Sequence, residues 1–450
     1  MLTMTDLFCG AGGSSTGAIS VPGVSVRMAA NHWTLAIETH NTNHPTTDHA
    51  CADISQVDPR LFPRTDILWA SPECTNHSVA KGVKRNLDAT PDLFGEVLPD
   101  AAADRSRATM WDVPRFAEHH QYKAIITENV VDAAKWIMFP AWLQAMELLG
   151  YRHRIVYLNS MHAQAAGLPA PQSRDRMYVV FWLKGNAEPD LDHWTRPTAY
   201  CSTCDETVTA IQGWKKPSPW GRYRTQYVWR CPRSKCRNSV VEPGWLPAAA
   251  AIDWTIKGQR IGDRTKPLAP KTLARIEAGL AKFSNTPFLS QFRERVRNLD
   301  PATEPLTTIV ADGANHGLIQ PGLLVPVEGR DGKEARMASE PMRTMTTRNE
   351  TAFVVPLRAN NTPKSVTEPY DTFAANGNHH ALAQAETPKL EDCLFRMLEP
   401  QEIARGMAFP DGYSILGNKR EQVRQAGNAV TPPAARDLVS AVADSLGVVA

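Results

Sequence analysis

Short apolar runs separated by longer mixed segments dominate the first 195 residues of the chain. The runs typical of strands are Leu2–Phe8, Val24–Ala30, Asp66–Ala70, Tyr122–Thr127, Ile155–Leu158 and Met177–Leu183, with a further strand before Ala52-Asp53-Ile54. Continuous apolar runs of this length are typical of strands that are buried on both faces of a parallel sheet. A helix is expected directly after the first strand, at Ser14–Ile19. The pattern therefore predicts an α/β fold around a mostly parallel sheet.

Helical periodicity returns at the end of the chain, over Arg396–Met407, with a start near Glu399-Pro400, and over Ala434–Leu446. Two prolines, Pro432 and Pro433, precede the second of these segments, and proline is common in the first turn of a helix. The character of the chain changes after Trp194, and we refer to residues 196–394 as the insertion.

The insertion contains an internal repeat. Three stretches between residues 303 and 382 share a Glu-Pro pair, which starts at positions 304, 340 and 368. Each copy reads as a strand, a polar turn and another strand, so we expect a β-rich module.

Composition limits the classes of protein to consider. Hydrophobic residues make up 42% of the chain and charged residues 21%, as in ordinary soluble proteins. The net charge is only +2, so contacts with nucleic acid would have to come from local basic patches. No apolar run reaches the length of about 18 residues needed for a membrane helix, and the N-terminus lacks the features of a secretory signal. We therefore expect no membrane partner.

Glycines follow the first strand directly, in the stretch Phe8-Cys9-Gly10-Ala11-Gly12-Gly13. A strand, a glycine turn and a helix form a common nucleotide-binding arrangement, because glycine lets a ligand approach the backbone. The same turn also occurs as a mere connection between strand and helix.

Cys74 is the first candidate for catalysis. The apolar run that ends at Ala70 breaks at Ser71-Pro72 and delivers Cys74 just past the carboxyl end of its strand. Ligands of open α/β sheets bind at that edge, so Cys74 is placed to act as a nucleophile. The alternative is a small buried cysteine in the core.

Two later segments add candidate polar groups. Glu128 follows the fifth strand and is either a solvated turn residue or a carboxylate directed into the cleft. Arg174 and Arg176 share one side of an extended segment because they are two residues apart. They form either a solvated basic edge or a pair of donors to an anionic or carbonyl group.

Four of the eight cysteines form two close pairs. Their members are Cys201, Cys204, Cys231 and Cys236. This spacing suits a structural zinc ribbon over residues 198–240, and the alternative is a chance grouping of thiols. Basic and aromatic residues surround the pairs, and they suit either nucleic-acid binding or the cover of a small zinc core.

Five of these motifs occur in the order seen in cytosine-5 DNA methyltransferases of the prokaryotic or phage type. They are DLFCGAGG (6–13), the strand-end Cys74, ENV (128–130), QSRDR (172–176) and GNAVTPP (427–433). The chain resembles that family over residues 1–195 and 395–450, which implies that these two stretches form one discontinuous catalytic domain with an insertion at 196–394. The resemblance implies a Rossmann-like S-adenosylmethionine-dependent methyltransferase domain with an inserted target-recognition domain, which here is β-rich and contains the zinc ribbon.

The resemblance also implies roles for individual residues. Cys74 would add to carbon 6 of a cytosine flipped out of duplex DNA, Glu128 would donate a proton at ring nitrogen 3, and Arg174 and Arg176 would hold the base carbonyl, the carboxylate or nearby backbone. The residues expected around S-adenosylmethionine are Phe8, Gly10, Ala11, Gly12, Gly13, Trp33, Asp53, Ile54, Asn428 and Val430. Repeat turns in the insertion would read base edges, among them Asn315 and His316.

Two positions depart from the family pattern. Glu73 stands where the family has proline before the nucleophile, and His32 stands where it has an acid for the ribose. An RNA methyltransferase of the same chemistry and a catalytically silent DNA-binding paralogue remain as alternatives. We also expect the protein to be a monomer in the bacterial cytoplasm. It would be encoded by the bacterium or by a phage, with a cognate restriction endonuclease as a partner.

Overall fold

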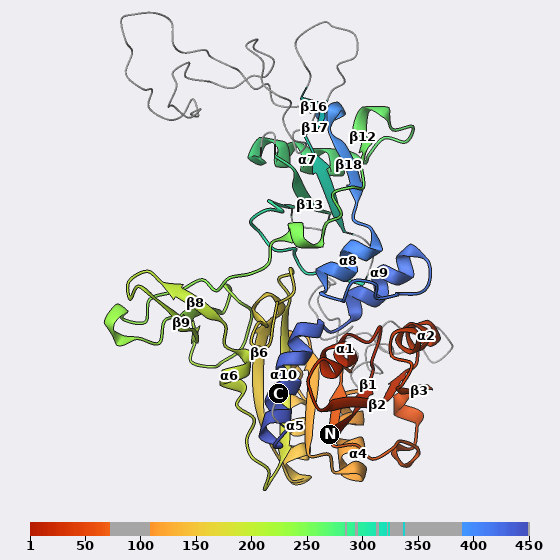
Figure 1. Cartoon of the computed structure of the whole chain (residues 1–450), viewed down its shortest axis with the longest axis vertical. Helices are drawn as coiled ribbons and strands as arrows, with labels where there is room; N and C mark the ends of the chain where they lie inside the picture. Colours follow the sequence, from red (N-terminus) through yellow and green to blue (C-terminus); the bar gives the residue numbers. More distant parts are fainter. Residues whose placement is uncertain are drawn as a thin grey trace, which may run out of the picture. The chain divides into compact units, whose positions relative to one another are not determined.

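A computed structural model describes the fold (Figure 1). The described residues are 1–72, 109–283, 286–292, 296–311, 315–321, 323–324, 336–337 and 389–448. They divide into two compact units, the first formed by residues 1–252, 302–314 and 399–450 and the second by residues 253–301 and 315–398. Residues 196–252 therefore belong to the first unit, whereas the sequence analysis groups them with the insertion.

A seven-stranded sheet with strand order β3-β2-β1-β4-β5-β7-β6 is the centre of the first unit. Its strands are β1 (Leu2–Leu7), β2 (Val24–Asn31), β3 (Asp48–Cys51), β4 (Ile67–Ala70), β5 (Ala124–Asn129), β6 (Tyr151–Asn159) and β7 (Asp175–Leu183). The first five pair in parallel, while β7 is antiparallel to both β5 and β6. The predicted α/β fold with a mostly parallel sheet is confirmed, and each predicted strand is present with slightly different ends.

Helices cover both faces of this sheet, which explains why the central strand β4 is apolar throughout. The helices of the first unit are α1 (Gly13–Ile19), α2 (Thr34–Asn43), α4 (Asp112–His120), α5 (Phe139–Leu148), α6 (Leu191–Thr195), α8 (Pro400–Gly406), α9 (Lys419–Asn428) and α10 (Pro432–Ser445). Ile67 and Trp69 of β4 pack in a core with residues of α10, whereas Leu68 and Ala70 pack with residues of α4 and α5. Alternate residues of a strand point to opposite faces, so one short apolar run supplies both cores. In Figure 1, α10 lies beside α1 across one face of the sheet.

The helix expected to begin near Glu399-Pro400 is present, because α8 begins at Pro400. Glu399 and Glu402 form a capping box that starts this helix, because each side chain accepts from the other residue's backbone N–H. Residues Leu394–Met397, just before it, form strand β18.

The second unit contains an antiparallel sheet with strand order β12-β18-β15-β13-β14. Its elements are β12 (Gln259–Arg260), α7 (Pro270–Phe283), β13 (Phe288–Phe292), β14 (Val296–Leu299), β15 (His316–Gln320) and β18. Ile276 and Leu280 of α7 pack with Phe288 and Phe395 in a separate core. The first repeat copy ends in β15, where His316 is buried, so the expectation that His316 reaches a base is wrong. The other two copies and their turns lie outside the described residues.

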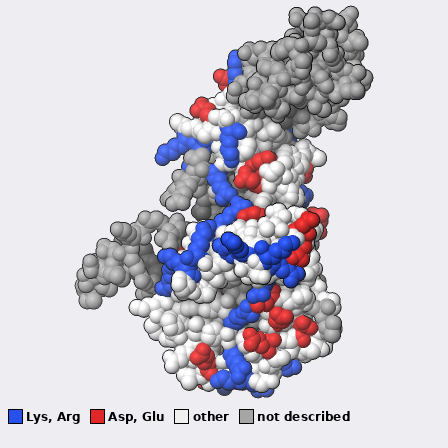
Figure 2. Space-filling model, turned by 90° about the vertical axis from the view of Figure 1, so that its left-hand side faces the viewer, with Lys and Arg blue, Asp and Glu red and all other residues white. Residues whose placement is uncertain are grey.

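Charged side chains of both signs lie on the surface, as expected from the net charge of +2. Figure 2 shows Lys and Arg side chains in groups on the face presented there, with Asp and Glu side chains beside several of them. Within the described ranges, no helix combines the length and apolar character needed to cross a bilayer.

Candidate active site

The glycine turn follows β1 at the carboxyl edge of the sheet, as the sequence predicts. Phe8, Gly10 and Gly12 have positive φ angles of 59°, 53° and 89°, a conformation that glycine adopts at low cost. Apart from Gly10 itself and its two chain neighbours, no heavy atom of the described residues lies within 4 Å of the place that a Cβ on Gly10 would occupy. The backbone at Gly10 can therefore be approached by a ligand.

The C-terminal segment closes the other side of the same turn. A Cβ on Gly13 would lie 1.9 Å from the Val430 carbonyl oxygen, and one on Gly12 would lie 2.5 Å from Tyr413 Oη. Only glycine permits such close packing at these two positions. The structure thus brings the motif at 427–433 against the motif at 6–13, although more than 400 residues separate them.

The remaining predicted cofactor residues differ in accessibility. Trp33 precedes α2, with the Arg424 guanidinium 4.8 Å from its ring centroid. Asp53 is exposed and accepts from the Ser55 N–H at 3.1 Å, whereas Ile54 is buried in the core. Asn428 is exposed at the end of α9, and Ala11 is buried in the glycine turn.

The segment leading to Cys74 begins beside Asn129, the neighbour of Glu128 in the chain. Strand β4 ends at Ala70, and Asn129 Nδ2 at the end of β5 donates to the Pro72 carbonyl at 3.4 Å. Cys74 and its neighbour Glu73 lie outside the described residues, as does most of the stretch 81–112, whose many charged and polar residues predict a long loop. The end of β4 and the adjacent end of β5 therefore define where the segment toward Cys74 begins.

Glu128 and Arg176 form an ion pair at this edge, with Arg176 Nε 2.8 Å from Glu128 Oε1. Both side chains are largely buried, at 12% and 14% exposure, so the pair is held in a fixed geometry. Between the two arginines, Asp175 accepts from the Tyr223 N–H at 3.0 Å, and burial raises the pKa of its carboxyl to about 6. The structure thus brings two predicted catalytic residues together.

Arg174 has different partners, although it is only two residues from Arg176. Its guanidinium donates to the carbonyls of Ile309, Gly427 and Ala429 at 2.9, 3.0 and 3.2 Å, and its side chain is buried. Of the three partners considered for the arginines, Arg174 contacts nearby backbone. Through these hydrogen bonds, Arg174 connects residues 302–314 of the first unit to the C-terminal motif at 427–433.

The four paired cysteines converge on one point of the first unit. All four sulfur atoms lie within 4.8 Å of one another, and the Cys204 and Cys231 sulfurs are 4.0 Å apart. Tetrahedral zinc with Zn–S bonds of about 2.3 Å separates its sulfur ligands by roughly 3.8 Å. The four thiols therefore fit a closed, structural zinc site, with strands β8 (Thr198–Cys201), β9 (Glu206–Thr209) and β11 (Tyr227–Arg230) around it.

We call residues 198–245 the cysteine module. It packs on the sheet next to Glu128 and Arg176, and this packing was not predicted from the sequence. Its apolar residues share one core with β5, β6 and β7. Gln212 donates to the Tyr157 carbonyl at 2.7 Å, and Trp229 Nε1 donates to His162 Nδ1 at 3.0 Å. Arg222 Nη2 lies 2.5 Å from Asp132 Oδ2, in the turn just after the ENV motif. No sequence pattern marks Arg222 or Asp132 as partners.

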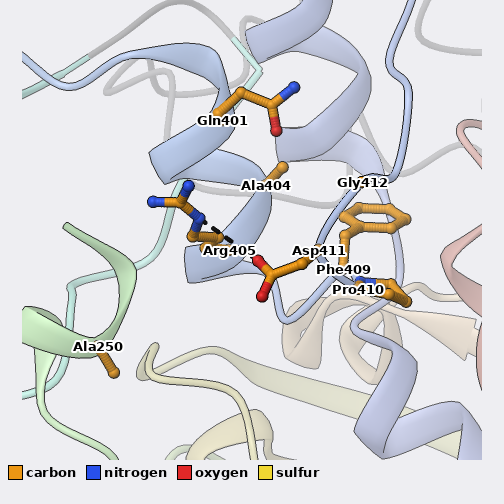
Figure 3. A pocket seen from close by; sticks show the side chains of 8 residues that line it. All are labelled: Ala250, Gln401, Ala404, Arg405, Phe409, Pro410, Asp411 and Gly412. Atoms are coloured by element: carbon orange, nitrogen blue, oxygen red, sulfur yellow. Dashed lines mark ion pairs between the residues drawn. The ribbon is translucent and has the colours of Figure 1, made fainter. Parts of the chain in front are cut away.

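A pocket of about 390 Å³ lies elsewhere, along α8 and the loop after it (Figure 3). Its lining includes Gln401, Arg405, Phe409 and Asp411, and Arg405 Nε lies 3.6 Å from Asp411 Oδ1. None of the residues predicted to act in catalysis or cofactor binding lines it. The candidate site is thus the strand edge described above, and not this pocket.

Solved structures with a similar fold define the class. A DNMT2 variant of Spodoptera frugiperda has a TM-score of 0.52 and 14% sequence identity, covering 98% of this chain and 99% of that chain. Dnmt2 of S. pombe has a TM-score of 0.51 and 13% identity, covering 99% of each chain. The fold class shared with these proteins is therefore mixed α/β, with layers of helices around a central sheet.

Within this class, the chain belongs to the C-5 cytosine-specific DNA methylase family, which it matches over residues 2–444. The resemblance drawn from its motifs is thereby confirmed. The Type II methyltransferase M.AgeI of Thalassovita gelatinovora is 25% identical over 479 residues, covering 97% of this chain and 98% of the relative. The Type II methyltransferase M.SsoII of Shigella sonnei is 28% identical over 199 residues, covering 43% and 46%.

Proposed function

We propose that the protein transfers a methyl group from S-adenosylmethionine to carbon 5 of cytosine in duplex DNA, through a covalent adduct with Cys74. The observation that carries this assignment is the Glu128–Arg176 pair beside the segment that leads to Cys74. Membership of the cytosine-specific family gives the reaction class.

The chemistry requires a nucleophile because carbon 5 of cytosine is itself unreactive toward an electrophile. The Cys74 thiolate adds to carbon 6, and the electron pair of the C5–C6 double bond makes carbon 5 an enamine-like nucleophile. Carbon 5 then forms a bond to the methyl carbon, and the sulfonium sulfur leaves with the bonding pair. Loss of the carbon 5 proton to a base restores the double bond and expels the Cys74 thiolate.

Glu128 assists the first step by donating a proton at ring nitrogen 3, so its carboxyl has to be protonated at that moment. Arg176 fixes the orientation of this carboxyl through the ion pair at 2.8 Å. Arg174 acts on the backbone of the C-terminal motif, and so supports the site without reaching the base.

The residues at the carboxyl edge of β1 fit S-adenosylmethionine, which supplies an electrophilic methyl group when bound. The open space beside Gly10 admits a ligand to the backbone at Phe8 and Gly10. Exposed Asp53 and Asn428 are available for polar contacts, and Trp33 offers a ring face near Arg424. Gly12 and Gly13, by contrast, serve the close packing of Tyr413 and Val430.

Reaction on duplex DNA requires the cytosine to be flipped out, because stacking covers both faces of the base. We assign the clamping step to the polar loop 81–112, which lies in the sequence between β4 and α4. Sequence recognition is assigned to the repeats at 303–382 and to the remainder of the insertion. The relatives named as Type II methyltransferases favour a restriction–modification setting with a cognate endonuclease.

We further propose that the four cysteines hold one structural Zn²⁺. The support is their convergence within 4.8 Å, which leaves four thiolates and no open coordination position. The metal then stabilises the cysteine module and has no part in the chemical step.

Methyl transfer from labelled cofactor to DNA and to RNA, run in parallel, tests the function. We expect label in duplex DNA at carbon 5 of cytosine in a defined sequence context. Label in RNA alone would favour the RNA methyltransferase. Absence of label in both, together with retained DNA binding, would favour the catalytically silent paralogue.

A further inference from the structure

His40 of α2 and His44, the C-cap of this helix, lie beneath the glycine turn. No motif of the family accounts for either histidine. His44 Nε2 is 3.1 Å from Thr16 Oγ1 and 3.2 Å from Tyr413 Oη. A Cβ on Gly12 would meet Tyr413 Oη, His40 Cδ2 and His44 Nε2 within 3.2 Å, so these side chains form the floor of the turn.

The direction of these hydrogen bonds follows from counting protons. A hydroxyl has one proton to donate. Tyr413 Oη gives its proton to the Ala11 carbonyl at 2.5 Å, and Thr16 Oγ1 gives its proton to the Gly12 carbonyl at 2.7 Å. Both hydroxyls therefore face His44 as acceptors, and His44 Nε2 has to carry the hydrogen. Burial lowers the pKa of His44 to about 4, which is consistent with a neutral ring that has a single defined tautomer.

His40 supports the adjoining start of α1 in the same way. The Ser15 hydroxyl donates to Asp6 Oδ2 at 2.7 Å, so it accepts from His40 Nε2 at 2.9 Å. His40 Nδ1 is then the acceptor for His49 Nε2 at 2.8 Å. Buried polar chains of this kind hold their members in one arrangement when each donor has an acceptor.

We propose that His44 is a positioning residue for the cofactor-binding turn, acting through the Tyr413 and Thr16 hydroxyls on the carbonyls of Ala11 and Gly12. This inference rests on the proposed function of the turn in binding S-adenosylmethionine. Tyr413 lies in the loop after α8. A change at Tyr413 should therefore alter cofactor affinity even though its side chain need not contact the cofactor.

Cofactor binding by isothermal titration calorimetry, with S-adenosylmethionine and S-adenosylhomocysteine as ligands, tests the proposal on the full chain. His44→Phe removes the donor and is expected to raise Kd about tenfold, the effect of one ordering hydrogen bond. His44→Gln retains an N–H at the position of Nε2 and should stay within about threefold of wild type. Tyr413→Phe should weaken binding as His44→Phe does, and the double variant should be no weaker than the poorer single one, because both changes break one chain.

His153→Phe is the matched control, because His153 is a partly buried histidine of β6 that pairs with Glu147 at the far side of the sheet. It should leave Kd unchanged. Folded His44→Phe and Tyr413→Phe proteins that bind like wild type would overturn the proposal, as would His44→Gln that binds as poorly as His44→Phe. If His44→Phe does not fold, Tyr413→Phe decides the question by itself. Wild-type protein that binds neither ligand would instead contradict the proposed function, and this inference with it.

Discussion

Arg176 Nε lies 2.8 Å from Glu128 Oε1, across the antiparallel pair formed by β5 and β7. Strand β6 lies between β5 and β7 in the sequence. In the sheet, however, β6 is the edge strand, and β7 is the direct neighbour of β5. Antiparallel β7 thus places the QSRDR motif at the same end of the sheet as the ENV motif. The proposed catalytic site at this edge depends on that reversal.

Arg176→Lys should lower the rate of methyl transfer by about ten- to a hundredfold while leaving cofactor affinity near the wild-type value. Lysine keeps the charge but not the planar guanidinium that fixes the carboxyl, and small errors in orientation are costly in rate. Single-turnover kinetics with saturating cofactor measure the effect. Arg154→Lys is the control, because Arg154 pairs with Asp192 away from the site. Equal rates for both variants would show that Arg176 does not orient Glu128.

Arg222→Ala should reduce the rate of methyl transfer about tenfold, since Asp132 is buried and lies two residues after the ENV motif. Without Arg222, Asp132 keeps its longer ion pair with Lys135, at 3.5 Å, and the turn that follows Glu128 should shift. Arg224→Ala breaks an exposed pair with Glu242 in the same module and should have little effect. The contrary result, an active Arg222→Ala enzyme with altered sequence preference, would assign this part of the module to target recognition.

The interface held by His162 should weaken in acid. Burial, with a smaller contribution from Arg224, lowers the pKa of His162 to about 3 in the folded protein, against about 6.5 in the unfolded chain. The folded protein holds His162 neutral, so its contribution to stability is fully present at pH values above the pKa of the unfolded chain. Protonation favours the unfolded chain, and this contribution is therefore lost as the pH falls from about 6.5 toward 3. At pH 5 the loss is about 2 kcal/mol relative to pH 7.5.

Denaturant unfolding as a function of pH checks this contribution. His162→Asn keeps an acceptor for Trp229 Nε1 but does not titrate, so its free energy of unfolding should fall less steeply between pH 7.5 and 5. The exposed His193→Asn variant controls for the loss of any histidine and should follow wild type. Parallel curves for His162→Asn and wild type would exclude the effect.

Metal analysis should find one zinc per chain, and Cys204→Ala should remove it. We expect the unfolding midpoint to drop by about 10 °C, because zinc binding contributes directly to folding of such modules. Cys51→Ala, an exposed cysteine of β3, should retain both metal and midpoint. Zinc-free protein with wild-type stability would refute the assignment.

Local pattern was enough to predict the strands, because most of them contain a short apolar run, and Ile67–Ala70, which is covered on both faces, is the clearest case. The glycine turn and Glu128 were equally visible, since turn geometry and strand ends have local signals. The packing of the cysteine module beside Asp132 was not predictable, because it depends on tertiary contacts between residues about 90 positions apart. Arg174 was ambiguous and His44 had no sequence signal, since only the structure shows which carbonyls and hydroxyls surround them.

The most direct test of the account is covalent trapping on a duplex that carries 5-fluorocytosine at the target position. Fluorine at carbon 5 cannot leave as a proton does, so the Cys74 adduct should persist after methyl transfer. Wild-type protein with S-adenosylmethionine should migrate as a denaturation-resistant protein–DNA complex, whereas Cys74→Ser should bind cofactor normally and form none. A Cys74→Ser protein that is trapped equally, or that retains full turnover, would contradict the assignment of Cys74 as the nucleophile.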